Sequence, residues 1–78
     1  MYRLRFYENG QFCTELGGPI PTLPMATQQM RRIARPIGAV EMSDIIGLQW
    51  MRSGVTPCAI AVVDDFGQFI TNKDQEDI

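Results

Sequence analysis

Apolar and more polar residues alternate over residues 2–7, YRLRFY, and this period of two predicts a β-strand. Asn9-Gly10 follows, and an Asn-Gly pair favours a type I′ hairpin turn because both central residues adopt positive φ. Residues 11–16 are then expected to return as the second strand. This register predicts three facing pairs: Tyr7 with Phe12, Phe6 with Cys13, and Arg5 with Thr14.

The pattern Gly-Gln-Phe-x-Thr occurs twice, at residues 10–14 and 67–71. Each copy follows a turn sequence, so each is interpreted as the start of the returning strand of a β-hairpin. In the second hairpin, residues 68–71 are expected to pair with residues 58–63, which are almost continuously apolar and so typical of a central strand. The chain is thus predicted to carry one hairpin near each end.

Two helices are predicted between the hairpins. Residues 17–22 contain two glycines and two prolines, which favours an irregular connection. Apolar residues then recur at helical spacing, and they predict a helix from about Pro24 to Arg35 that ends at Pro36. A second short helix is expected over residues 43–51, where an N-cap serine precedes a broad apolar stripe.

These elements predict an α+β domain of ββααββ order, in which two β-hairpins form a small antiparallel sheet and two short helices pack on one of its faces. Residues 1–72 are expected to form a single compact domain, and residues 73–78 a frayed acidic tail. Two edges of the sheet would remain unpaired, so a second chain could add there.

The composition indicates a folded cytoplasmic protein. Hydrophobic residues make up 45% and charged residues 21% of 78 residues, the net charge is −2, and no apolar run approaches the roughly 20 residues of a membrane span. In such a compartment Cys13 and Cys58 are expected to stay reduced, as buried thiols within strands.

Residues that carry common catalytic chemistry are missing. Histidine is absent, which removes the usual general base and most catalytic zinc sites. Two cysteines 45 positions apart form no zinc or redox pair, and no glycine-rich phosphate loop is present. Asp64-Asp65 is interpreted as a solvated hairpin tip, because it lacks the further oxygen ligands of a metal loop. We therefore expect no enzyme activity, no cofactor and no metal.

Arginines on the first predicted helix are the most suggestive charges. Arg31 and Arg35 lie four residues apart, Arg32 lies between them, and Gln28 precedes them by one turn. Such a group can bind carboxylates or phosphates, or it can be a solvated face that pairs with the chain's own acids. The acidic net charge and a single lysine disfavour nucleic acid. The candidate contact residues are Arg31, Arg32, Arg35, Gln28, Trp50, Asp64, Asp65 and Tyr7.

These features predict a small non-catalytic protein-interaction module, an inhibitor or adaptor that binds a larger protein or complex. In size and make-up the chain resembles accessory proteins of phages and mobile elements, including anti-CRISPR and other host-takeover inhibitors. That resemblance implies a role in the host cytoplasm. Two alternatives stay open: a small DNA-binding regulator that uses the Arg31/Arg32/Arg35 helix, and a homo-oligomeric assembly protein, such as a homodimer, that is joined at its sheet edges.

Overall fold

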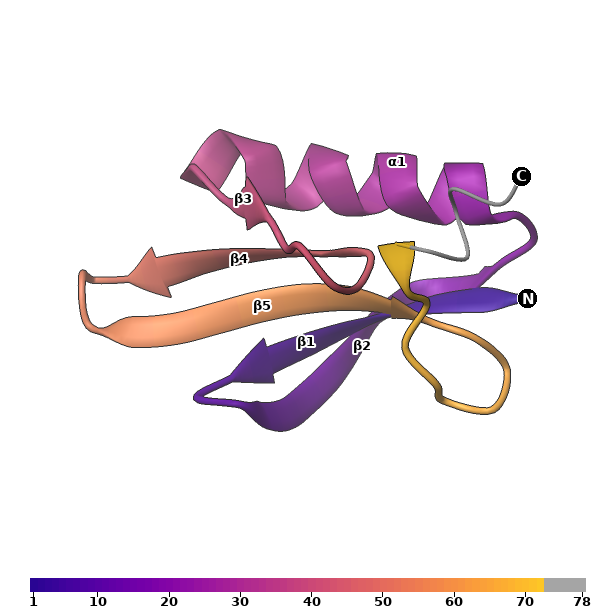
Figure 1. The fold of residues 1–78 in the computed structure, drawn as a ribbon, viewed down its shortest axis with the longest axis horizontal. Coiled ribbons are helices and arrows are strands. Elements are labelled where there is room, and N and C mark those ends of the chain that lie inside the picture. Colours follow the sequence, from indigo (N-terminus) through magenta and orange to yellow (C-terminus); the bar gives the residue numbers. More distant parts are fainter. Residues whose placement is uncertain (73–78) are drawn as a thin grey trace.

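A five-stranded antiparallel sheet carries a single α-helix on one face (Figure 1). The structure is a computed structural model that describes residues 1–72, so the tail predicted for residues 73–78 lies outside the described residues. The sheet order is β2-β1-β5-β4-β3. The elements are β1 (Tyr2–Glu8), β2 (Gln11–Ile20), α1 (Leu23–Ala34), the 3-10 helix η1 (Arg35–Ile37), β3 (Val40–Glu41), β4 (Gly47–Arg52) and β5 (Thr56–Val63).

The first predicted hairpin is confirmed. Asn9 and Gly10 form its turn with φ values of 54° and 77°, and Tyr7 lies opposite Phe12. The next two predicted pairs are wrong because a β-bulge inserts one extra residue into β2. That bulge moves the pairing on by one residue, so that Phe6 faces Thr14 and Arg5 faces Glu15.

The predicted ββααββ order with two helices is wrong. Residues 43–51 contain no helix, and β4 pairs there with β5 and with the short β3. Ile46, Leu48 and Trp50 all pack into or against the core, and they recur at every second position. That spacing is the period of a strand. The same apolar residues had suggested a helical stripe, because a short apolar run fits both periods.

The predicted second hairpin does not form as a regular strand pair, although Phe69 bridges to Val63 within the expected partner segment. β5 lies between β1 and β4, so neighbouring strands already occupy both of its hydrogen-bonding edges. Residues 68–71 consequently form no regular strand, and they contribute isolated bridges from Phe69 to Val63 and from Thr71 to Ile45. The loop that connects β5 to residues 68–71 lies on the side of the sheet away from α1 (Figure 1).

The edges of the sheet are short or irregular. β3 contains two residues, while β2 continues through Gly17-Gly18-Pro19 to Ile20, a stretch predicted as a connection. The register of β2 against β1 shifts twice. Bulges, proline and short edge strands all hinder the addition of a further strand. Cys13 is exposed on this edge, contrary to the prediction, whereas Cys58 is buried.

Helix α1 agrees with the prediction to within one residue at each end. The side-chain oxygen of Thr22 caps its N-terminus by accepting a hydrogen bond from the backbone N–H of Met25 at 3.3 Å. Met30 faces the sheet and is 1% exposed. The core between the two layers contains Leu4, Ile20, Ala26, Met30, Ala34, Ile46, Leu48, Ile60 and Val62. Among the described residues, no helix is long and apolar enough to cross a lipid bilayer.

Candidate functional site

The eight candidate contact residues do not form one site. Gln28, Arg31, Arg32 and Arg35 share the outer side of α1 and line one shallow surface pocket. Tyr7 lies on the sheet face away from the helix, because β1 alternates and Leu4 and Phe6 pack toward α1. Asp64 and Asp65 lie in the loop after β5. Trp50 lies on the helix side of β4.

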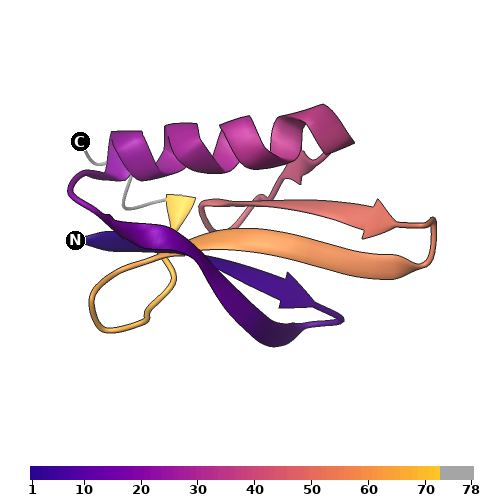
Figure 2. The same cartoon turned by 180° about the vertical axis from the view of Figure 1, so that it is seen from behind.

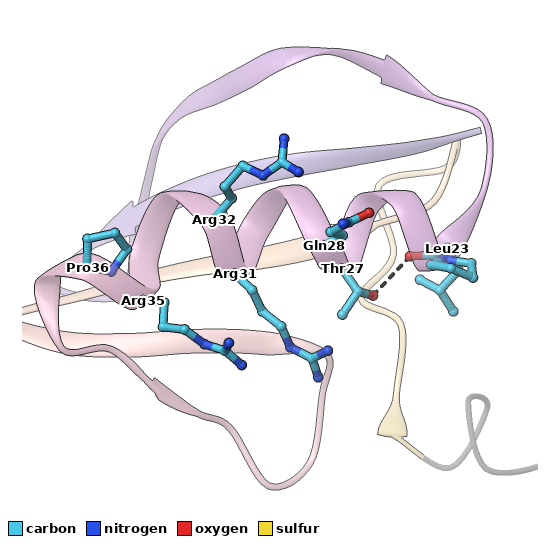
Figure 3. Close-up of a pocket in the computed structure, with 8 residues that line it drawn as sticks. Leu23, Thr27, Gln28, Arg31, Arg32, Arg35 and Pro36 are labelled. Carbon is cyan, nitrogen blue, oxygen red and sulfur yellow. Dashed lines mark hydrogen bonds between the residues drawn. The ribbon is translucent and has the colours of Figure 1, made fainter.

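The four α1 residues form what we call the cationic strip: Gln28, Arg31, Arg32 and Arg35. All the residues that line this pocket belong to α1 or to the turn that follows it, so the strip has no second wall. Arg32 leaves one flank of the helix, while Arg31 and Arg35 leave the other flank, toward the segment that contains β3 (Figure 3). The strip is therefore an open surface and not an enclosed cavity.

The three arginines differ in their partners. Arg31 donates to Glu41 Oε1 through Nε at 3.0 Å, and also through Nη2. Within residues 1–72, neither Arg32 nor Arg35 has a carboxylate within ion-pair distance. Among the acids of residues 1–72, one thus neutralises Arg31, and none pairs with Arg32 or Arg35.

The two aspartates have contacts within their own loop. Asp64 Oδ1 accepts hydrogen bonds from the backbone N–H groups of Phe66 at 2.8 Å and Gln68 at 3.0 Å, which is an Asx-type turn. Asp65 Oδ2 accepts from the amino group of Met1 at 2.7 Å. These contacts fold the loop and fix its position against β1.

Trp50 packs inside the protein more than on its surface. Its ring stacks on Phe6, with centroids 6.0 Å apart and planes at 27°. Both residues are partly buried against the core between sheet and helix. Trp50 thus fills space beside the core and lies apart from the outward side of α1, although it was predicted from the sequence as a contact residue.

Tyr7 belongs to a surface group that we call the aromatic face, made of the half-buried Arg5 and Tyr7 and the exposed Phe12 and Phe69. The Tyr7 ring centroid is 6.0 Å from that of Phe12 and 5.8 Å from that of Phe69. The guanidinium of Arg5 lies 5.2 Å from the centre of the Phe12 ring. Phe12 is 53% exposed and Phe69 is 46% exposed, so two large rings face solvent.

Both copies of the repeated sequence pattern contribute a ring to this face. Phe12 and Phe69 are the third residues of the two Gly-Gln-Phe-x-Thr copies, and the fold brings both rings against Tyr7. The first pairing follows from the hairpin alone. The second depends on the loop that returns beneath the sheet, where the backbone of Gly67 approaches the guanidinium of Arg5. Sequence reasoning therefore found Tyr7 and its pairing with Phe12 but missed Phe69.

Two arginines on or beside the aromatic face lie close to the same glutamate. Arg3 Nη1 and Arg5 Nε each lie 3.6 Å from Glu15 Oε1. Arg5 is additionally held over the Phe12 ring. The aromatic face thus combines apolar rings with partly compensated charge, since one glutamate lies beside two arginines.

These surfaces offer contacts and show no metal-binding group. Within the part of the chain that the structure describes, no three His, Cys, Asp or Glu side chains are placed to hold a metal ion. No family model matches the sequence, and no curated protein or solved structure matches it either. The two surfaces on opposite sides of the sheet are therefore the features from which a function can be inferred.

Proposed function

We propose that this chain is a small non-catalytic protein-interaction module, an inhibitor or adaptor that binds a larger protein through its aromatic face. The observation that carries the proposal is the cluster in which the exposed rings of Phe12 and Phe69 contact the half-buried ring of Tyr7. Monomeric proteins rarely leave such rings together in solvent, and aromatic residues and arginine are enriched at the centres of interfaces.

The charge of this face favours a protein partner over a nucleic acid. Single-stranded nucleic acids bind aromatic platforms that lie within a positive groove, where cations follow the phosphates. Here Glu15 lies beside both Arg3 and Arg5, which lowers the local positive potential. A partially neutralised apolar face is suited to bury against another apolar protein surface.

The alternative of a DNA-binding regulator has less support from the fold. A helix-turn-helix needs two consecutive helices, and residues 1–72 contain one α-helix, followed by a single 3-10 turn and strands. We propose instead an inhibitor of the kind that phages and mobile elements encode, such as an anti-defence protein, acting in the host cytoplasm. Its support is the aromatic face, where the exposed rings of Phe12 and Phe69 contact Tyr7.

A capture experiment with matched variants tests the proposal. The tagged chain is expected to retain a stoichiometric protein from a nuclease-treated bacterial lysate. The double variant Phe12→Ser/Phe69→Ser should retain at least about tenfold less, because loss of two interface rings costs well over 1 kcal/mol. Val55→Ser is the control, since Val55 is 76% exposed but lies in the turn between β4 and β5.

Several outcomes would contradict the proposal. Capture that is equal for the wild type and the double variant would exclude the aromatic face, provided that thermal unfolding shows both proteins to be folded. Material that the chain retains from untreated lysate but not from nuclease-treated lysate would favour the DNA-binding regulator. A melting temperature that rises with protein concentration, with no captured protein, would favour the homo-oligomer.

A further inference from the structure

We propose that the cationic strip of α1 is a second docking surface, which binds an acidic protein segment that carries several carboxylates. This inference goes beyond the proposed function, because it assigns a separate partner to the opposite side of the molecule. If both surfaces are used, the module is an adaptor that joins two proteins.

The two surfaces lie on opposite sides of a two-layer molecule. Helix α1 covers one face of the sheet, and the strip lies on its outer side (Figure 1, Figure 3). The aromatic face lies under the same sheet, where the loop after β5 contributes Phe69. The β1–β2 hairpin also twists away from α1 toward its tip (Figure 1, Figure 2). A partner on one side therefore leaves the other side accessible.

Charge decides which partner the strip fits. Arg32 and Arg35 are exposed and have no carboxylate partner among the described residues, whereas Arg3, Arg31 and Arg52 each pair with a glutamate. The helix thus presents positive charge that no carboxylate of residues 1–72 compensates. An acidic surface complements this charge, and arginine binds carboxylates with paired, directional hydrogen bonds.

The direction of the side chains indicates an extended ligand. The side chains of Arg32 and Arg35 point to opposite flanks of the helix, so in this structure their guanidinium groups do not converge on one small anion (Figure 3). A segment that crosses or follows the helix can place a carboxylate on each flank. Leu23 and Pro24 at one end and Pro36 at the other add apolar contacts along the same strip.

A nucleic acid is the less suitable polyanion for this surface. Phosphate binding needs a sustained positive field, and the strip has two uncompensated charges in a chain with a net charge of −2. Glu41 lies beside the strip, bound to Arg31, and would repel a continuous phosphate backbone on that flank.

Fluorescence anisotropy provides the test. The probe is a fluorescein-labelled peptide of alternating glutamate and serine, and the comparison is between the full-length wild type and Arg32→Gln/Arg35→Gln. We expect the variant to bind the peptide about tenfold more weakly, which corresponds to about 1.4 kcal/mol. The control Arg3→Gln/Arg52→Gln removes the same charge from two ion-paired arginines and should bind within about twofold of wild type, as expected for exposed pairs of low net energy.

Each other outcome would overturn the inference. If both double variants bind the peptide equally more weakly than wild type, total charge alone attracts the peptide. If wild type shows no measurable binding, the strip is not a docking site for acidic segments. A single-stranded oligonucleotide of equal charge is tested at the same salt concentration. If wild type binds it more tightly than the peptide, and Arg32→Gln/Arg35→Gln loses that binding, the strip is assigned to nucleic acid. Phe12→Ser/Phe69→Ser should bind the peptide like wild type, so this test and the test of the aromatic face can fail separately.

Discussion

Replacement of Leu4 with alanine is expected to lower the free energy of unfolding by about 3 kcal/mol. Leu4 is 1% exposed and belongs to the core cluster that joins the sheet to α1. It lies between β2 and β5, whose ladders restrict any collapse around the vacated volume. For a domain of this size the loss corresponds to a fall in melting temperature of about 10–20 °C. Urea unfolding followed by circular dichroism measures it.

Met51→Ala is the matched control for this prediction. Met51 is 56% exposed on β4, and its side chain points away from the helix-facing core. We expect its truncation to change the free energy of unfolding by less than about 0.5 kcal/mol. Equal effects of the two truncations would contradict the assignment of Leu4 to the centre of the core.

Gly47→Ala is expected to lower the free energy of unfolding by about 2 kcal/mol. A Cβ atom at this position would lie 2.9 Å from the carbonyl oxygen of Ile60 and 3.0 Å from Met42 Sδ. The carbonyl belongs to β5, so the clash can be relieved only by moving the β4–β5 ladder. If residues 43–51 formed the helix predicted from the sequence, the same substitution would instead stabilise the chain by about 1 kcal/mol.

Gly18→Ala provides the control for Gly47→Ala. A Cβ atom at Gly18 would have no neighbour within 4 Å, and the residue lies on the edge strand β2. We expect its effect to stay within about 0.5 kcal/mol, with chemical unfolding as the measurement for both variants. A more stable Gly47→Ala protein would contradict the close approach of β4 to β5.

Local sequence signals were sufficient to predict the first hairpin turn and helix α1, but not the register of β2. The Asn9-Gly10 turn determined the first hairpin, since positive φ at both positions favours one turn type. Helix α1 was predicted to within one residue at each end, because an early proline, apolar residues at helical spacing and the proline that follows Arg35 all act within a few residues. The bulge in β2 had no such signal, so the register beyond it was wrong by one residue.

The second half depends on pairing between distant segments. β5 pairs with β1, which lies 50 to 60 residues earlier in the chain, on one edge and with β4 on the other, and β4 takes most of the edge that residues 68–71 were expected to occupy. Residues 43–51 then complete the other side of β5 as a strand, although their apolar residues also fit a helical stripe. No local propensity in the sequence distinguishes those outcomes, because the partner strand selects between them.

For the candidate contact residues, too, some features followed from local sequence spacing and others depended on the tertiary fold. The group on α1 was predicted correctly as neighbours, since helical spacing determines their positions. The exposed environment of Tyr7 needed the tertiary fold, because Phe69 reaches it from the loop after β5. Which of the arginines are neutralised also depends on distant residues, such as Glu41 beside Arg31 and Glu15 beside Arg5.

Photo-crosslinking from position 12 tests the central claim most directly. A photoreactive benzoyl-phenylalanine replaces Phe12 in one protein and Val55 in another, and each is irradiated in nuclease-treated bacterial lysate. Both positions are exposed, but Phe12 contacts Tyr7 on the aromatic face whereas Val55 lies in the turn after β4. A discrete protein adduct from position 12 and none from position 55 is the predicted result. An adduct from position 55 alone would contradict the aromatic face as the binding surface.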